Sequence, residues 1–454
     1  MKSRYKSLFM GLLLLSGCNP LSVENMIDPN NPSEVGFTQN ATREQVQFLI
    51  TGLEEKHRNY VFTATAALGS FGREVWYLNG SDPRFTTDWL GQALAEPNSS
   101  FFGFGNTGGT VFFNPYQAVR QGELLIKSVN SAPQVTDVEK SAVAGFARTI
   151  QGFQLMLPAN LVYENGIRVD IAEPMKPGPF VTYQEAMNHI KGLLDDGYAQ
   201  LNKASGNFAF KLTSGFNGYN SIDGLKKVNR AIAARNAVYR KDWQGALDAV
   251  NASFMNLSGT LNAGPAHPFG SAPDIFNPLY YVPNANVNTM VVVHPKLITD
   301  ATPGDKRVAD KFYQRTSPVV NSTTYAVLEG MYQDKRWATN SASVPFIKNE
   351  ELILIKAEAH AQLNQNADAV AAINVIRTGA GLAPYAGATD KDALINEILY
   401  QRRYSLWAEP WGHRWVDARR YDKLNEIDTS LDKGKVFKQF PHPQAEKGWE
   451  EYVK

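Results

Sequence analysis

The chain has 454 residues, with 45 Lys and Arg against 44 Asp and Glu, so its formal net charge is +1. A balance this close to neutral excludes the clustered basic face that nucleic-acid binding needs, and we expect no nucleic-acid partner. No stretch of 18 apolar residues follows the N-terminal segment, so no membrane-spanning helix is expected either.

The first 18 residues have the pattern of an export signal that ends in a lipidation site. Basic residues at positions 2, 4 and 6 precede an apolar stretch over 8–15, which is too short to cross a bilayer. The stretch closes on Leu15-Ser16-Gly17-Cys18, and Cys18 is the only cysteine of the chain, so it has no internal disulfide partner. The segment resembles a bacterial lipobox, which implies cleavage after residue 17 and acyl chains on Cys18. An ordinary secretory peptide with a chance cysteine is the alternative.

The residues that follow are expected to form a tether and then one long domain. Residues 18–37 are short of apolar residues and contain prolines, as a lipid-anchored tether would, and residues 38–454 form the predicted domain. Without residues 1–17 the formal charge becomes 42 − 44 = −2. Acyl chains on Cys18 would then be the only membrane attachment.

The first long helical pattern covers residues 42–68, where Thr42 and Gln45 have the spacing of a capping box. Residues 69–113 then lose this periodicity and are rich in Gly, Phe, Trp and Asn. They predict a long loop excursion, and loops of such length are usually functional when they are ordered.

Helical patterns in pairs dominate the rest of the chain. They cover residues 115–129, 137–163, 183–203, 222–240, 243–255, 345–363, 367–377, 391–407 and 414–424. Between them, residues 259–343 form a second irregular excursion with β-prone runs at 290–293 and 325–328. The chain is therefore predicted to be mainly α, a tetratricopeptide-like superhelix of helix pairs with two loop excursions and at most small β elements. An unrelated helical bundle is the alternative.

The C-terminal third contains four linked motifs of one known family. Residues 344–359, 371–382, 398–409 and 412–420 resemble the recurrent helices of SusD/RagB proteins in order and spacing. The chain departs from that pattern at Gln401, where the family usually has Glu before the paired arginines Arg402 and Arg403.

The resemblance implies a cell-surface lipoprotein of the Bacteroidetes type, held at the outer membrane by its lipid alone. Such proteins bind oligosaccharides or polysaccharides and deliver them to a SusC-like TonB-dependent outer-membrane barrel, without catalysis and without a cofactor. Some branches bind peptides, and this remains an alternative, as do a lipid-anchored glycan hydrolase and a scaffold for envelope proteins.

Charged residues near the C-terminus are expected to lock the last helices together rather than to catalyse a reaction. A bidentate Arg–carboxylate pair needs only suitable geometry. The residues concerned are Arg402, Arg403, Glu409, Asp417, Arg419 and Arg420.

Sugar binding needs flat aromatic platforms for the apolar ring faces and polar side chains for the hydroxyls. The two excursions offer both, with Trp76 and Trp89 as the platforms. The predicted ligand-binding residues are Trp76, Tyr77, Asn79, Asp82, Arg84 and Trp89 in the first excursion, and Tyr280 and Tyr281, with Asn284 beside them, in the second. The alternative for each ring is that it pins a loop to the helical body.

No motif for catalysis or metal binding supports an enzyme. The chain has neither His-Glu-x-x-His nor Gly-x-Ser-x-Gly, and residues 103–108 spell a dinucleotide fingerprint without the strand that such a site requires. A pair of carboxylates for glycoside hydrolysis remains open at this point, because their separation depends on the fold.

Overall fold

A computed structural model describes residues 34–93, 97, 110–173, 176–446 and 448. The expected signal segment and Cys18 lie outside these residues, as do residues 103–108. Of the expected tether, the structure describes only its last residues, which lie in a short helix, α2 (Glu34–Thr38).

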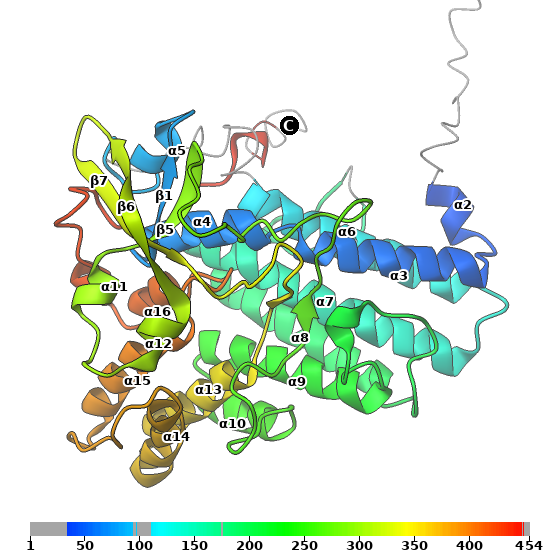
Figure 1. The fold of residues 1–454 in the computed structure, drawn as a ribbon. Helices are drawn as coiled ribbons and strands as arrows, with labels where there is room; N and C mark the ends of the chain where they lie inside the picture. The colour runs from blue at the N-terminus through cyan, green and yellow to red at the C-terminus, as the bar shows by residue number, and fades with distance from the viewer. Residues whose placement is uncertain (1–33, 94–96, 98–109, 174–175, 447, 449–454) are drawn as a thin grey trace, which may run out of the picture.

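Helices make up most of the described chain, as the sequence predicts (Figure 1). The longer ones after α2 are α3 (Arg43–Arg58), α4 (Val61–Phe71), α6 (Thr110–Ser131), α7 (Asp137–Val162), α8 (Tyr183–Leu201), α9 (Ile222–Tyr239), α10 (Trp243–Asn251), α13 (Asn349–Gln362), α14 (Asn366–Gly379), α15 (Lys391–Ser405) and α16 (His413–Arg420). Short helices are α5 (Arg84–Thr87), α11 (Lys296–Thr299) and α12 (Lys306–Lys311), with 3-10 turns at Tyr163–Asn165, Ser214–Phe216 and Leu424–Glu426.

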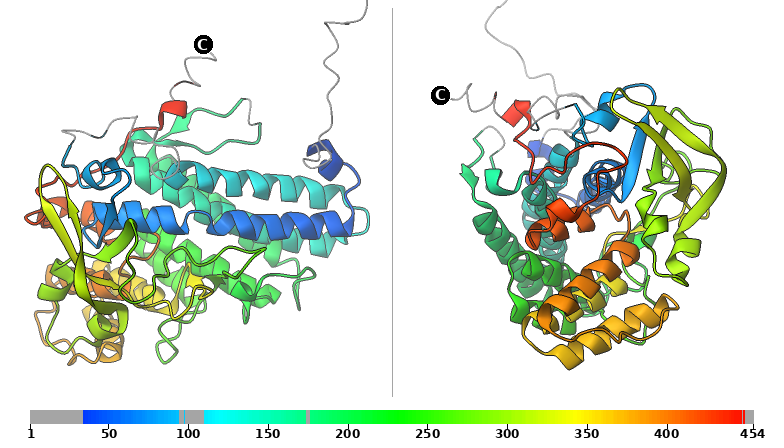
Figure 2. Two further views of the ribbon diagram at one scale, coloured as in Figure 1. Left: turned by 45° about the horizontal axis from the view of Figure 1, so that its top comes forward. Right: turned by 90° about the vertical axis from the view of Figure 1, so that its left-hand side faces the viewer.

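Successive helices pack side by side. Each helix contacts the next in the series α3, α6, α7, α8, α9, α10, α13, α14 and α15. In the end-on view of Figure 2 the helices follow one another in an arc, and the sheet lies along the other side of the molecule. This arrangement confirms the helix-pair superhelix. Within the described residues, no helix combines the length and apolar character needed to span a bilayer.

Capping residues fix the helix starts where the sequence places them. The Thr42 hydroxyl accepts a hydrogen bond from the Gln45 backbone N–H at 3.2 Å, and Glu185 and Thr182 form the same reciprocal box at the start of α8. Asp242 caps α10 by accepting from the Gly245 N–H at 3.0 Å.

The helix predicted over residues 42–68 is in fact two helices. α3 ends at Arg58 and α4 starts at Val61, and the carbonyl of Asn59 at the break accepts a hydrogen bond from the Asn114 side chain of α6 at 2.9 Å. Because a side chain from another helix satisfies a backbone group freed by the break, sequence periodicity alone could not reveal it.

Strands from both excursions form one antiparallel sheet, in the order β1-β5-β7-β6. Its strands are β1 (Val75–Asn79), β5 (Thr289–Val293), β6 (Phe312–Ser322) and β7 (Val327–Asp334), and two-residue pairs join β2 (Ile167–Arg168) to β3 (Phe180–Val181) and β4 (Ala266–His267) to β8 (Val344–Pro345). The strand expected at 290–293 is confirmed, whereas the one expected at 325–328 begins later, at Val327.

The first excursion is not irregular throughout, because β1 lies in it. The run Val75-Trp76-Tyr77-Leu78 pairs with Met290–Val293 of the second excursion, and all of β1 is buried. The hydrogen bonds of β1 come from a strand more than 200 positions away in the sequence. Local periodicity cannot predict a strand that depends on such a distant partner.

The arginine network at the C-terminal end is structural, as expected. Asp417 pairs with Arg402 at 2.5 Å and with Arg420 at 2.7 Å, and Arg420 also pairs with Glu358 at 2.7 Å, with all four side chains at most 6% exposed. Three members bind elsewhere: Arg403 pairs with Asp300, Glu409 with Lys348, and Arg419 donates to the backbone carbonyls of Asn160 and Lys438.

Candidate functional site

The predicted aromatic platforms are buried. Trp76 and Trp89 are each 2% exposed. The Trp76 ring meets His294 edge-on at 4.9 Å between centroids, while Tyr77 stacks on Trp89 at 5.3 Å. Neither tryptophan presents a ring face to a ligand in this structure, so the interpretation of both as open platforms is not supported.

The location of β1 explains this burial. Alternate side chains of a strand point to opposite faces, and here both faces are covered. Val75 and Tyr77 belong to the main hydrophobic core, whereas Trp76 and Leu78 join a second small core that includes Leu328 of β7. The rings pin the excursion to the body, as the alternative interpretation holds.

The polar residues predicted after β1 mainly organise their own turn. Asn79 Oδ1 accepts hydrogen bonds from the backbone N–H groups of Ser81 and Asp82, at 3.0 and 2.9 Å. Arg84 donates two hydrogen bonds to the Asp82 carboxylate, at 2.8 and 2.6 Å, and this pairing lowers the pKa of Asp82. The charges of Asp82 and Arg84 therefore neutralise one another.

The two predicted tyrosines of the second excursion are both partly buried. Tyr280 is half-buried, and Tyr281 packs against both the main core and the small core. Burial raises the pKa of Tyr281 to about 12. Neither ring lines a hollow with the first excursion, but Asn284, three residues further on, does.

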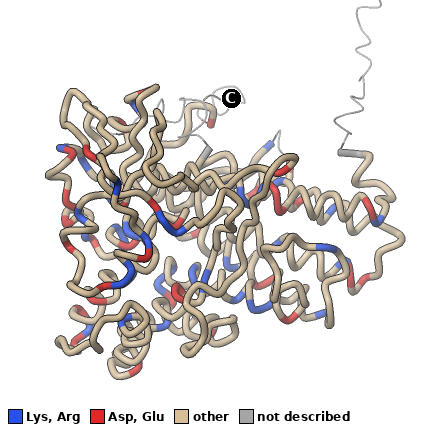
Figure 3. Tube along the Cα trace, in the orientation of Figure 1, with Lys and Arg blue, Asp and Glu red and all other residues tan. Residues whose placement is uncertain are grey.

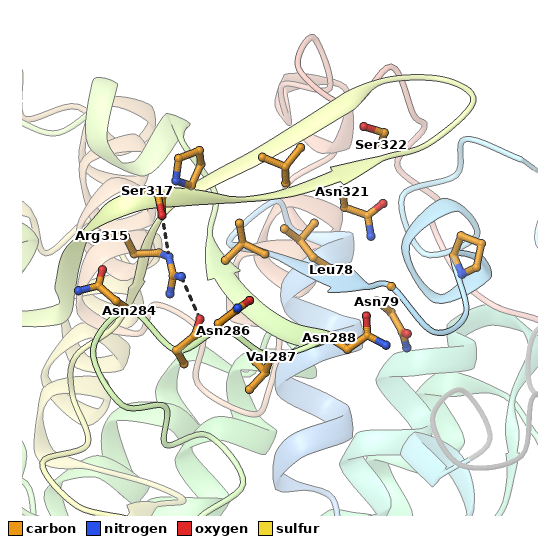
Figure 4. A pocket seen from close by; sticks show the side chains of 16 residues that line it. Leu78, Asn79, Asn284, Asn286, Val287, Asn288, Arg315, Ser317, Asn321 and Ser322 are labelled. Carbon is orange, nitrogen blue, oxygen red and sulfur yellow. Dashed lines mark hydrogen bonds between the residues drawn. The ribbon is translucent and has the colours of Figure 1, made fainter.

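The two excursions meet around a hollow of about 650 Å³ (Figure 4). β1 and the turn after it form one wall, the loop before β5 forms the floor, and β6 forms the opposite wall. The lining residues are Leu78, Asn79, Gly80, Pro83, Asn284, Ala285, Asn286, Val287, Asn288, Arg315, Ser317, Pro318, Val319, Val320, Asn321 and Ser322.

Close contact between the turn after β1 and the loop before β5 fixes one corner of the hollow. The Gly80 N–H donates to the Asn288 carbonyl at 2.8 Å, and the Asn288 side chain donates to the Ser81 hydroxyl at 2.5 Å. A Cβ at position 80 would collide with the end of the Asn288 side chain, so any larger residue there would force that side chain to move.

An irregularity in β6 forms the opposite wall. Gln314 pairs with Tyr332 and Val319 pairs with Gly330. Between these two pairs β6 advances by five residues, whereas β7 advances by only two. The extra residues, which include Ser317 and Pro318, bulge out of the ladder, and such bulges re-aim side chains.

Arg315 lies at the start of this bulge and is 6% exposed. Its Nε donates to the Ser317 carbonyl at 3.1 Å and its Nη2 to the Ala285 carbonyl at 2.9 Å (Figure 4). Its Nη1 donates to Gln333 Oε1 at 2.7 Å. Arg315 thereby joins β6, β7 and the loop before β5 at the edge of the hollow.

The polar side chains around the hollow are suited to hydrogen bonding with a ligand. Five of its lining residues are asparagines, and an amide carries both donors and an acceptor for a ligand rich in hydroxyl groups, although the side chains of Asn79 and Asn284 already form such bonds within the protein. Val287 and Val320, 45% and 54% exposed, add apolar surface. Among the described residues that line it there is no carboxylate and no histidine, so the two-carboxylate chemistry of glycoside hydrolysis has no groups here. The described part of the chain also holds no group of three or more potential metal ligands.

Sequence reasoning found the two excursions but missed most of the residues that line the hollow. Of the predicted residues only Asn79 and Asn284 line it, while Asn286, Asn288, Asn321 and Arg315 were not identified. The run Asn284-Ala285-Asn286-Val287-Asn288 was a usable signal, because three asparagines in five residues are unusual and rich in hydrogen-bonding groups.

Comparisons with known proteins agree with this architecture. Residues 299–454 match the SusD family. A SusD-like protein of Formosa agariphila is 33% identical over 96 residues, which cover 19% of this chain and 19% of that protein, so the match spans less than a fifth of the curated relative.

Solved structures share the fold over nearly the whole length. A SusD superfamily protein of Bacteroides fragilis superposes with a TM-score of 0.67 at 15% identity, covering 90% of this chain and 97% of that chain. Surface glycan-binding protein A of Bacteroides thetaiotaomicron, solved in complex with laminarihexaose, also gives 0.67, at 13% identity and with 90% and 98% coverage. The chain is therefore similar to the SusD family in the sequence of its C-terminal third, and it shares the fold of SusD superfamily structures over its described length.

Proposed function

We propose that this protein is a surface lipoprotein that captures oligosaccharides in the hollow between β1 and β6 and passes them to a SusC-like TonB-dependent transporter. The observation that carries the proposal is the meeting of both excursions around an asparagine-lined hollow. A laminarihexaose complex of a protein with the same fold supports a glycan as the ligand. Anchoring through Cys18, a location at the cell surface and the absence of catalysis are parts of the same proposal.

Glycan binding is tested by affinity electrophoresis of the mature domain in gels that contain single polysaccharides. Asn286 and Asn321 line the hollow, and replacing both with Leu removes hydrogen-bonding groups without cutting the ladder of β6. We expect wild type to be retarded by at least one glycan and the double variant to lose most of that retardation. Asn188→Leu, on the exposed surface of α8, is the matched control. Equal retardation of wild type and the double variant would reject the hollow as the site.

The remaining parts need separate measurements. Mass spectrometry of the membrane form should find acyl chains on Cys18 and none on a Cys18→Ala variant, which should be released from the membrane. Co-purification from solubilised outer membranes should recover the transporter. Incubation with the retarding glycan should release no new reducing ends, and their release would mark a hydrolase.

A peptide ligand is the second candidate. Among the described residues that line the hollow there is no aromatic ring, and aromatic platforms were the feature that favoured sugar. Isothermal titration of a peptide mixture against the same wild type and double variant separates the two candidates.

A further inference from the structure

One residue of the hollow is a buried cation without a matching anion. Arg315 is 6% exposed, yet its hydrogen-bond partners are two backbone carbonyls and the amide of Gln333. No carboxylate within the described part of the chain forms an ion pair with it. Most other buried arginines of this protein do have such partners, among them Arg73 with Asp432 at 2.8 Å and Arg235 with Glu351 at 2.6 Å, although Arg419, like Arg315, donates to carbonyl oxygens.

The surroundings of Arg315 do not offset its charge. No acidic side chain lines the hollow among the residues that the structure describes. Asp82, in the turn after β1, is already paired with Arg84. Glu329 faces Val320 across the ladder of β6 and β7, but it is not a lining residue. Figure 3 shows few charged residues over this part of the sheet.

Such burial is unfavourable for the charged form. Taking a guanidinium out of water without a counter-charge costs free energy, and burial lowers the pKa of Arg315 accordingly. An anion that entered the hollow would offset this cost, and its attraction to the cation would be stronger there than in bulk water.

Arg315 also retains hydrogen-bonding capacity. A guanidinium has five N–H groups, and three of them meet oxygen acceptors here. A fourth approaches the sulfur of Met290 at 3.7 Å, which is a weak acceptor. The second N–H of Nη2 therefore remains for a ligand at the edge of the hollow.

We propose that the hollow selects glycans with an oxyanion, a uronate carboxylate or a sulfate ester, and that Arg315 pairs with it. This inference rests on the proposed function and specifies its ligand class. Asparagine side chains around the oxyanion would bind the sugar hydroxyls, while Arg315 supplies the charge that distinguishes acidic from neutral glycans.

The test is isothermal titration with three probes of equal length: hexagalacturonate, a sulfated carrageenan hexasaccharide and neutral laminarihexaose. Wild type is compared with Arg315→Gln, which removes the cation, and with Asn286→Asp, which adds a carboxylate to the hollow and leaves Arg315 in place. Asn188→Asp adds the same charge on α8, away from the hollow, as the control. A salt series from 50 to 500 mM accompanies each titration.

We expect wild type to bind one acidic probe at least about tenfold more tightly than the neutral one, since a charge-assisted hydrogen bond contributes that much or more. The identity of the tighter acidic probe separates carboxylate from sulfate. Arg315→Gln and Asn286→Asp should each reduce the preference for the acidic probe about tenfold, and Asn188→Asp should not change it. High salt should lower the affinity for the acidic probe more than the affinity for the neutral probe.

Equal affinity for neutral and acidic probes in wild type would overturn the inference while leaving glycan capture intact. So would an acidic preference that both variants retain. If Arg315→Gln does not fold, the titrations of Asn286→Asp alone test the inference. Binding of none of these or other glycans would reject the proposed function itself, and selective binding of acidic peptides would assign the same cation to a different ligand class and overturn the inference for glycans.

Discussion

Gln333 Oε1 accepts a hydrogen bond from Arg315 Nη1 at 2.7 Å, and the same oxygen accepts one from the Asn284 backbone N–H at 3.1 Å. Its Nε2 donates to the carbonyl of Val282 at 3.0 Å. One buried amide of β7 thus connects β6 with the loop that forms the floor of the hollow. Because its partners lie in β6 and in the loop before β5, Gln333 is a positioning residue for the site.

Replacing Gln333 with Leu should loosen the site and destabilise the protein. The variant leaves Arg315 and the Asn284 N–H without their acceptor, so we expect unfolding free energy to fall by about 2–4 kcal/mol. Chemical denaturation measures this loss, and affinity electrophoresis measures the expected loss of glycan retardation. Gln184→Leu, on the exposed surface of α8, should change neither. An unchanged denaturation midpoint in Gln333→Leu would contradict the positioning role.

Gly80→Ala should affect binding more than folding. The new Cβ would push the Asn288 side chain away from Ser81 and move the floor of the hollow relative to β1. We expect glycan affinity to drop about tenfold with a stability loss of about 1–2 kcal/mol. Gly192→Ala in α8, where a Cβ meets no atom, serves as the control and should not weaken binding. Equal affinity of Gly80→Ala and wild type would show that this corner does not shape the site.

Local features of the sequence predicted the helical part of this fold well. Capping at Thr42, Thr182 and Asp242 depends on residues three positions apart, and all three caps form. The pairing of Arg402 and Arg420 with Asp417 was predictable because a short turn connects α15 to α16. In each case the interacting residues are close in sequence.

The site was much harder to predict, because it depends on contacts between distant segments. Val75 pairs with Val293, and this pairing turns an aromatic-rich loop into a strand with two covered faces. The bulge that places Arg315 at the hollow shows only in the register of β6 against β7. The sequence therefore predicts exposed tryptophans, whereas Trp76 lies in the small core beside the sheet and Trp89 packs on Tyr77 of β1.

Trp76→Ala separates the structural role of this ring from a binding role. Trp76 fills a small core with Leu78, Leu90 and Leu328, so its truncation should reduce unfolding free energy by about 3–5 kcal/mol. Trp76→Phe should keep most of that stability. If Trp76→Phe also keeps glycan retardation, the ring acts through packing. Normal stability together with lost retardation in Trp76→Phe would instead restore the platform role.

Asp417→Asn should be strongly destabilising. Burial raises the pKa of Asp417, but the charges of Arg402 and Arg420 outweigh that effect, and the resulting pKa lies below the usual value. Removing the carboxylate leaves the buried guanidinium of Arg402 without its ion-pair partner and takes one of two partners from Arg420, which keeps Glu358, and this costs about 3–5 kcal/mol. Thermal unfolding measures the effect. Glu164→Gln breaks the exposed pair with Lys438 and should cost less than about 1 kcal/mol. Similar losses in both variants would contradict a special role for Asp417.

Glu74 should make stability fall as pH rises. Its side chain is fully buried, and burial raises the pKa to about 7, although the Ala408 N–H at 3.2 Å and the charges of Arg414 and Arg336 act in the opposite direction. A carboxyl group ionises near pH 4.3 in the unfolded chain, so between that pH and about 7 the folded state holds a proton that the unfolded state has lost.

Over that window the contribution of Glu74 should decline by up to about 1.4 kcal/mol per pH unit and then level off. Glu74→Gln has no proton to lose, so the difference in unfolding free energy between variant and wild type should be nearly constant below pH 4 and grow in favour of the variant up to pH 7. Urea denaturation at half-unit pH intervals measures this difference, in which groups common to both proteins cancel. Parallel pH profiles would show that Glu74 is already ionised in the folded protein, stabilised by Arg336 and Arg414.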